Sequence, residues 1–466
     1  MNNEAGGVTR RSGNMIILGI VLAILTYWLF AQTFLNLGPH LQNTFNTSQG
    51  IINLSISLTS LITGIFMVAA GNLSDKLGKV RFTFIGIILS IVGSLMLIIT
   101  GNAYIMLAGR VIQGFSAAML MPATISILNS IFEGKARRSA LSWWSIGAFG
   151  GTGFASFFGG AVSTYMGWQW IFIISIALSL LALFLLKELR HHTVPLPKGG
   201  LSFDYAGLAL FTILMAALSV FITQGDTVGW LSPISLALIA VVLASAFVFY
   251  RVEKKKDKPF IDFSLFANRS YTGVASGNFL LNMSVGSIAV FNIYTQSNLG
   301  LTAFESGLVT LPYVILLLLL VRVGEKSIAK YGPKKALMAA PVLLSVGVVF
   351  LTLTFFDGLG FIISALIGFS FFGAGVGLFA TPALDTAVSS LPSDKTGVAS
   401  AIFKMASTLG QGFGIAILVS VYSLLNGLFG IEWAASGAFM VNIAIIITAF
   451  LFIKVFLPEK VDEIVE

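Results

Sequence analysis

The stretch from Gly71 to Arg81 places an acid among bases between two apolar segments, a pattern that could form a switchable ion pair. It reads Gly71-Asn72-Leu73-Ser74-Asp75-Lys76-Leu77-Gly78-Lys79-Val80-Arg81. Asp75 is positioned to pair with Lys79 or Arg81, or to sit at the positive N-terminus of a neighbouring helix. Gly71 and Gly78 allow a tight turn and a close approach of two helices. The alternative is a solvated loop whose bases only orient the chain.

Arg110 is the second candidate, because it lies inside an apolar segment and is followed by Gln113 and Gly114. It falls about seven residues into a helix, or roughly 10 Å from its end. A guanidinium at that depth normally faces a cavity or a partner, which makes it a functional candidate. The alternative is that its long side chain snorkels to the interface.

Few other groups could carry a proton. Glu133 resembles Asp75 in lying beside bases at the end of an apolar segment, which favours an ion-pair gate. Glu305 begins a later segment as either a helix-capping acid or a protonatable site. His40 has an ordinary pKa near 6.5, which suits a switch, although a polar interface residue is the alternative. Lys404 is either a buried cation or a snorkelling one, and no proton carrier is singled out.

Candidates for binding a substrate combine aromatic rings with amides inside apolar segments. Unpaired amides are unfavourable in lipid, so these should face a cavity or another helix. The chain also has 40 Phe and 13 Met, and polarizable side chains tolerate varied ligands. The cavity candidates are Trp28, Gln32, Asn36, Asn278, Asn282 and Tyr294, with Asn292 nearby.

The elements that position these residues are transmembrane helices. The chain is 56% hydrophobic and 10% charged, with a mean hydropathy of +0.94, whereas soluble domains carry about 25% charged residues. Each of fourteen apolar segments has the length of about twenty residues that a helical span requires. We therefore predict an all-α integral membrane protein with fourteen transmembrane helices.

Positive charge lies on one side of this predicted topology. Alternate loops carry the lysines and arginines, while the opposite loops, near His40, Asn102, Thr164, Asp226, Asn298, Asp357 and Glu432, have none. This bias predicts a multi-pass protein of the cytoplasmic membrane with both termini in the cytoplasm. It also explains the net charge of +8 without a nucleic-acid partner.

Two basic, proline-containing stretches divide the chain into a 6 + 2 + 6 arrangement. The predicted regions are a cytoplasmic tail (1–13), a six-helix bundle (14–187), linkers with two extra helices (188–269), a second six-helix bundle (270–457) and a cytoplasmic tail (458–466). The stretch from Gly71 to Arg81, here called the opening motif, has a weak repeat in the second half: Gly324-Glu325-Lys326 followed by Gly332-Pro333-Lys334-Lys335. Such repeats are expected in transporters whose site lies between two bundles.

The motifs are similar to those of the major facilitator superfamily. G-x-L-x-D-K-x-G-K-x-R resembles its loop between helices 2 and 3, which implies a gate that breaks and reforms. R-x-x-Q-G resembles the fourth-helix signature of fourteen-helix drug:proton antiporters, in which the arginine is associated with proton transfer. Gly151, Gly159 and Gly160 match the helix-5 exporter motif, whose central Gly-Pro is replaced here by Ala155-Ser156.

The first span lacks the acid that fourteen-helix exporters commonly place before a proline. Its Trp-Leu-Phe-Ala-Gln run, followed by Asn36 and Pro39, instead resembles the Nor-type quinolone-resistance pumps of this family. That resemblance implies a proton-coupled multidrug exporter of quinolones, dyes and similar amphiphiles, working as a monomer by alternating access. Without a central acid, zwitterionic or neutral amphiphiles are the expected cargo.

Several function classes remain open or are excluded. The chain has no Cys and no Walker-type phosphate loop, so we expect no metal, no cofactor, no ATP hydrolysis and no enzyme activity. One alternative is an exporter of a single endogenous metabolite. Another is a non-transporting membrane sensor or scaffold.

Overall fold

The computed structural model describes residues 10–132, 134–191, 204–256, 259–391 and 396–458, and within these ranges the chain forms helices and no strand. The first group comprises α1 (Arg10–Leu25), η1 (Thr26–Phe30), η2 (Ala31–Thr33), α2 (Phe34–Phe45), α3 (Gln49–Leu77), α4 (Lys79–Ile99), α5 (Ala103–Ile131), α6 (Gly134–Tyr165), α7 (Gln169–Leu185) and η3 (Lys187–His191). The second comprises α8 (Tyr205–Val228), α9 (Pro233–Glu253), η4 (Phe263–Ala267), α10 (Arg269–Met283), α11 (Gly286–Asn298), α12 (Ala303–Val309), α13 (Leu311–Leu351), α14 (Gly358–Ser389), α15 (Thr396–Phe429) and α16 (Ile431–Phe456).

These helices have the lengths and composition of membrane spans. Within the described residues, twelve helices are long and apolar enough to cross a membrane. The count reaches thirteen if the bent pair Phe154–Tyr165 and Gln169–Leu185, which turns by 117°, forms one span. The chain is therefore a multi-pass helical membrane protein.

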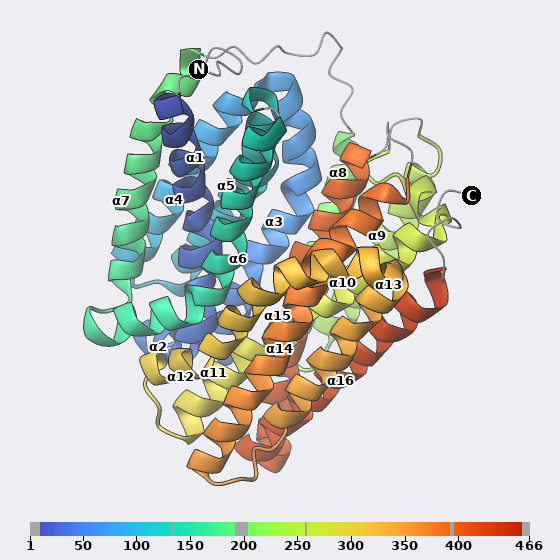
Figure 1. Ribbon diagram of the computed structural model, residues 1–466. Coiled ribbons are helices and arrows are strands. Elements are labelled where there is room, and N and C mark those ends of the chain that lie inside the picture. Colours follow the sequence, from blue (N-terminus) through green and yellow to red (C-terminus); the bar gives the residue numbers. More distant parts are fainter. Residues whose placement is uncertain (1–9, 133, 192–203, 257–258, 392–395, 459–466) are drawn as a thin grey trace.

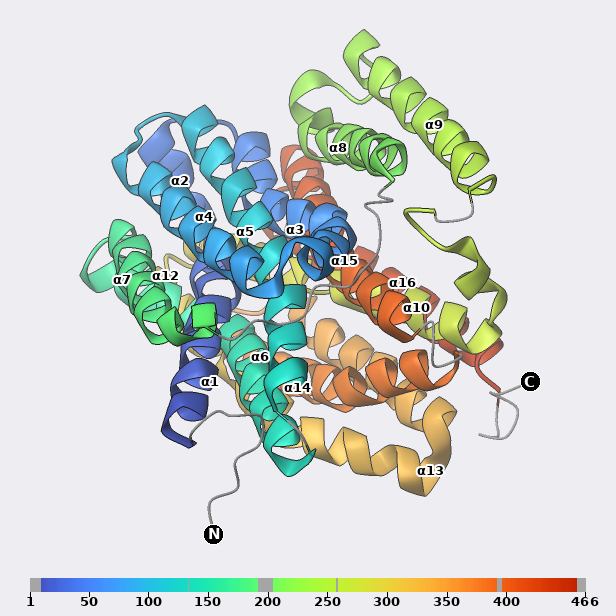
Figure 2. The ribbon, with the colours of Figure 1, turned by 90° about the horizontal axis from the view of Figure 1, so that it is seen from above.

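The helices gather into two halves with a separate pair at one flank. In Figure 2, α1 to α7 lie on one side and most of α10 to α16 on the other, with α12 reaching under the first group beside α7, while α8 and α9 form a hairpin outside both. The two halves contact each other where α3 packs on α15, α2 on α11 and α6 on α12. α8 packs against both α3 and α15, so the hairpin covers the line where the halves meet.

Hydrogen bonds join three helices at this flank. Asn53 of α3 donates to the Ser420 hydroxyl of α15 at 3.0 Å, and Ser420 donates to the Ile222 carbonyl of α8 at 2.8 Å. Asn53 also donates to the Ala416 carbonyl at 3.1 Å. Polar bonds between helices satisfy groups that would be unfavourable against lipid. These bonds link α3 to α15 and α15 to α8, while α8 contacts α3 by packing.

A second polar cluster closes the other end of the α8–α9 hairpin. Lys256, just past α9, forms ion pairs with Asp204 and, at 3.1 Å, with Glu253. Asp204 also caps α8 by accepting from the Gly207 amide at 2.8 Å. Glu253 is buried and accepts from the Ile261 amide at 3.2 Å. The start of α8, the end of α9 and the chain that leads to α10 are thereby held together.

The first span is not a regular α-helix. α1 passes through a π-helical turn, η1, and a 3-10 turn, η2, before α2 continues to Phe45. The Ala31 amide is shared between the carbonyls of Thr26 and Tyr27. Such changes in the hydrogen-bond ladder re-aim carbonyls and often mark functional sites. Here the irregular turns face α3, α5 and α6.

A positive-φ glycine interrupts the helices at the corresponding motif in each half. Gly78 separates α3 from α4 with a φ of 108°, and Gly332 breaks α13 with a φ of 77°. Both values are accessible mainly to glycine. The loop of the opening motif is thus a single-residue turn, and Pro333 begins the helix after the second turn.

Candidate functional site

A central cavity lies between the two halves. Its volume is about 450 Å³, and η1, α3, α5 and α6 line it from the first half while α10, α13, α14 and α15 line it from the second. Its walls reach exposed Asn129, close to the end of α5, and Ser400, close to the start of α15. The cavity therefore extends toward the end of the molecule where α1 begins and α16 ends, here called the terminus end (Figure 1).

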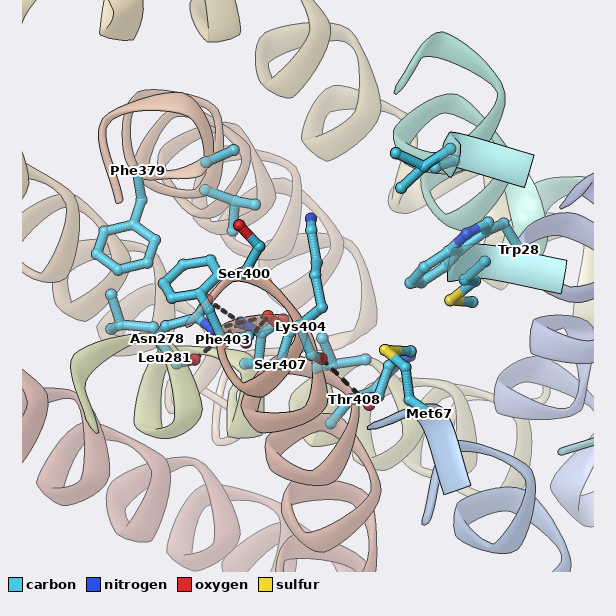
Figure 3. Close-up of a pocket in the computed structure, with 18 of the residues that line it drawn as sticks. Trp28, Met67, Asn278, Leu281, Phe379, Ser400, Phe403, Lys404, Ser407 and Thr408 are labelled. Atoms are coloured by element: carbon cyan, nitrogen blue, oxygen red, sulfur yellow. Dashed lines mark hydrogen bonds between the residues drawn. The ribbon is translucent and has the colours of Figure 1, made fainter. Parts of the chain in front are cut away.

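The second half supplies most of the polar wall. Asn278 donates to the Phe403 carbonyl at 2.9 Å and to the Ser407 hydroxyl at 2.7 Å. Asn282 donates to the side-chain oxygen of Asn278 at 2.9 Å. The two predicted amides thus line the cavity as an ordered pair held on α15. Figure 3 shows Lys404 extending from α15 into the space between the halves.

The first half supplies an aromatic wall built on the irregular turn. Trp28 of η1 lines the cavity opposite Lys404 (Figure 3), and its ring packs edge-on against Tyr27 with centroids 4.9 Å apart. Gly151 of α6 lies directly behind it, since a Cβ there would come within 3.0 Å of the Trp28 Cβ. Of the predicted cavity residues, Trp28, Asn278 and Asn282 line this space.

Arg110 is buried inside the first half and does not snorkel. Its side chain donates to the carbonyls of Ser55 at 2.8 Å, Ala31 at 2.9 Å and Ile56 at 3.4 Å. It also donates to Gln113 at 2.8 Å. No described carboxylate forms an ion pair with it, and carbonyl oxygens accept the hydrogen bonds of its charged donors.

The irregular first span explains how Arg110 is satisfied. The Ala31 carbonyl lies at the junction of η1 and η2, where the helical ladder is interrupted and an oxygen can accept from another helix. Phe34 covers the guanidinium with its ring centroid 4.1 Å away. Gln32 is also buried here, donating to Ser60 at 3.4 Å. Gln32 therefore packs the first half together and does not line the cavity.

The end opposite the termini, here called the sealed end, is closed by amides that cross between the halves. Asn36 of α2 donates to the Ala303 carbonyl at 2.8 Å and accepts from Gln296 of α11 at 2.7 Å. It also donates to the Ser156 carbonyl of α6 at 2.7 Å. Asn292 adds a bond to the Leu35 carbonyl at 3.1 Å. Asn36 thus belongs to the seal and not to the cavity wall.

Glycines and aromatic rings complete this seal. A Cβ on Gly160 would collide with the Ala303 carbonyl, and one on Gly159 would come within 2.7 Å of the Thr33 Cβ. Phe304 packs against Phe157 with ring centroids 5.6 Å apart. The helix-5 glycines therefore let α6 approach both the first span and α12.

Tyr294 lies in the core of the second half. Its hydroxyl donates to the Thr354 carbonyl at 3.0 Å, and its ring packs against Phe361 with centroids 5.0 Å apart. Glu305 lies at the surface in a capping box with Thr302, accepting from the Thr302 amide at 2.8 Å. His40 is exposed on α2. None of these three lines the cavity.

The opening motif lies at the terminus end, where α3 turns into α4. Gly71 faces Pro122 of α5 at ordinary contact distance, Lys79 is half-buried and Arg81 is exposed. The side chain of Asp75 and the whole of Glu133 lie outside the described part of the structure. The ion-pair gate stays a prediction.

Sequence reasoning did not single out Gln296, Ser156 or Gln411. Gln296 and Ser156 gain their role from contacts across more than a hundred positions of the chain. The one available signal was an amide or hydroxyl inside an apolar segment, which should face a helix or a cavity.

Two helical halves around one cavity, closed at one end and reached from the other, are the arrangement of a membrane transporter. The chain belongs to the major facilitator superfamily, whose family model matches residues 16–415.

Curated relatives cover nearly the whole chain. The quinolone resistance protein NorB of Staphylococcus aureus strain MRSA252 is 42% identical over 457 residues, covering 97% of this chain and 98% of that protein. NorB of strain COL is 43% identical over 452 residues, covering 96% and 97%.

Solved structures share the fold at low identity. A D-xylose-proton symporter aligns with a TM-score of 0.68 and 16% identity, covering 96% of this chain and 98% of that one. The POT family transporter PepTSo aligns with a TM-score of 0.69 and 14% identity, also covering 96% and 98%.

Proposed function

We propose that the protein is a proton-coupled multidrug exporter that moves quinolones and similar amphiphiles out of the cell by alternating access. The observation that carries this proposal is the cavity between the halves, accessible from the terminus end and closed by Asn36 at the sealed end. The likeness to NorB over almost the full length supports the cargo class. The chain would act as a monomer in the cytoplasmic membrane.

In this proposal both termini face the cytoplasm and the sealed end faces outward. The loop charges support that orientation. Counting α6 and α7 as separate spans, on either side of their 117° bend, would complete the fourteen expected. Regions 14–187 and 270–457 would then rock as two bundles, with the two extra helices of 188–269 at their flank.

Arg110 and the opening motif take the coupling and gating roles in this proposal. Arg110 and Gln113 form a buried polar unit that is hydrogen-bonded to the irregular first span. A conformational change in that span would therefore alter the hydrogen bonds of the guanidinium. The bases around Gly78 would pair with Asp75 and Glu133 to close the cytoplasmic side.

The test is transport in proteoliposomes under an imposed pH gradient. We expect quinolone movement that depends on the gradient and is inhibited by unrelated dyes. Indifference to the dyes would favour a single-metabolite exporter, and no movement with or without a gradient would favour a sensor or scaffold. Asp75→Asn and Arg110→Ala are expected to lower coupled transport.

Topology is tested separately. The chain has no cysteine, so single cysteines at Thr164 and Lys255 can be labelled from either side. Both positions are exposed, Thr164 at the end of α6 and Lys255 just past α9. Labelling of both from the same side would overturn the topology.

A further inference from the structure

The cavity wall carries one lysine and no acid among its described residues. The lining includes Lys404, but neither Asp nor Glu. The ammonium lies in a wall that is otherwise mostly apolar and aromatic, with Phe403 and Phe379 on the same side (Figure 3). In such surroundings a positive charge attracts anions and repels cations more strongly than it would in water.

Two further residues of the cavity wall carry buried side-chain hydrogen-bond donors. The indole nitrogen of Trp28 and the amide nitrogen of Gln411 are buried, and no described group accepts a hydrogen bond from either. An indole N–H can only donate. A buried donor without an acceptor is unfavourable, so a ligand that turns these side chains toward the cavity and brings them an acceptor would relieve that cost.

We propose that the cavity selects amphiphiles by an acidic end, with the Lys404 ammonium binding a substrate carboxylate. Trp28 and Gln411 would donate to that carboxylate or to a neighbouring carbonyl, and the aromatic wall would hold the flat apolar body. The predicted class is therefore carboxylate-bearing anions and zwitterions, in preference to permanent cations. This inference rests on the proposed export function but concerns binding alone.

The test compares two ligands that differ only at the carboxylate. A quinolone and its methyl ester share the same ring system, and the ester removes the negative charge while keeping a carbonyl. Dissociation constants are measured on the detergent-purified protein, without a pH gradient. We expect the unmodified protein to bind the acid at least about tenfold more tightly than the ester, because hydrogen bonds to charged groups are among the strongest.

Substitutions at Lys404 separate charge recognition from packing. Lys404→Gln is expected to weaken binding of the acid about tenfold while leaving the ester within about twofold, and Lys404→Arg to retain the preference. The matched control is Lys454→Gln, which removes an exposed ammonium from α16 and is expected to change neither ligand. Equal losses for acid and ester in Lys404→Gln would overturn the proposal.

The unmodified protein provides a readout even if the variants fail to fold. Equal affinities for acid and ester would refute carboxylate selection without any substitution. Transport of the same pair in proteoliposomes distinguishes the two proposals. Selective binding without gradient-driven movement would refute the export function and leave the carboxylate site standing.

Discussion

Replacing Asn36 with alanine is expected to loosen the sealed end while leaving the cavity wall intact. Asn36 crosses between the halves by donating to Ala303 and accepting from Gln296. Alanine removes both of these bonds between the halves, and also the bond to the Ser156 carbonyl, which lies within the first half and is lost equally in the open and the sealed conformation. The remaining bond from Gln296 to the Asn36 carbonyl, at 2.9 Å, involves the backbone and survives.

The size of the effect follows from the two lost bonds. A hydrogen bond between neutral groups contributes about 1 kcal/mol net. In a conformation opened at this end, water would satisfy the same groups, so the loss falls on the sealed conformation alone. About 2 kcal/mol corresponds to a shift of roughly 30-fold in the ratio of open to sealed protein.

Because the chain has no native cysteine, the rate at which one introduced cysteine is labelled can report opening of the sealed end. Ser156 is buried in the seal and its hydroxyl bonds to Asn292 of the other half, so a cysteine introduced there should react with a maleimide only when the sealed end opens. We expect Asn36→Ala to accelerate that reaction about 30-fold in detergent. Asn426→Ala, which removes an exposed amide at the end of α15, serves as the matched control and is expected to have no effect.

The alternative role for Asn36 gives a different result. If its amide binds substrate, the variant will lose substrate affinity while the cysteine at position 156 reacts at an unchanged rate. A change in rate of less than about threefold would refute the assignment of Asn36 to the seal.

Three further predictions concern the same framework. Arg110→Lys keeps the positive charge, but an ammonium cannot reach all of the carbonyls to which the guanidinium donates. We therefore expect the free energy of unfolding, measured by denaturation in detergent, to fall by about 2 kcal/mol. An unchanged midpoint of denaturation would contradict the buried network. Gly160→Ala puts a methyl group against the Ala303 carbonyl, so it is expected to hold the sealed end open and raise labelling at position 156, whereas wild-type labelling would show that α6 and α12 do not touch there. Glu305→Gln preserves the capping box with Thr302 and is expected to leave proton-coupled transport and the melting temperature unchanged; loss of coupling with normal stability would restore Glu305 as a proton carrier.

The sequence predicts those features of the structure that depend on residues close together in the chain. The spacing of Arg110 and Gln113 places both on one face of a helix, and the structure joins them by a hydrogen bond. The position of the turn between the two apolar segments also followed from the sequence, although both helices extend into the charged stretch, to Leu77 and from Lys79, and leave Gly78 alone as the turn. The amides of Asn278 and Asn282, four positions apart, likewise reach the cavity together.

Depth in the molecule and the identity of distant neighbours could not be predicted. Asn36 and Trp28 lie eight positions apart in the irregular first span, yet one closes the seal and the other lines the cavity. That difference depends on where the second half touches the first span. From the sequence, Lys404 could be either a buried or a snorkelling cation. Its place in the cavity wall becomes clear only when the two halves are seen together.

The two flanks of the molecule differ within the plane of the bilayer, because the α8–α9 hairpin is held on one of them by the hydrogen bonds of Asn53, Ser420 and Ile222. On that flank α8 and α9 stand between surrounding lipid and the meeting line of α3 and α15. An amphiphile already dissolved in the leaflet therefore meets a helical wall on that flank and has no direct sideways path past the α3–α15 contact.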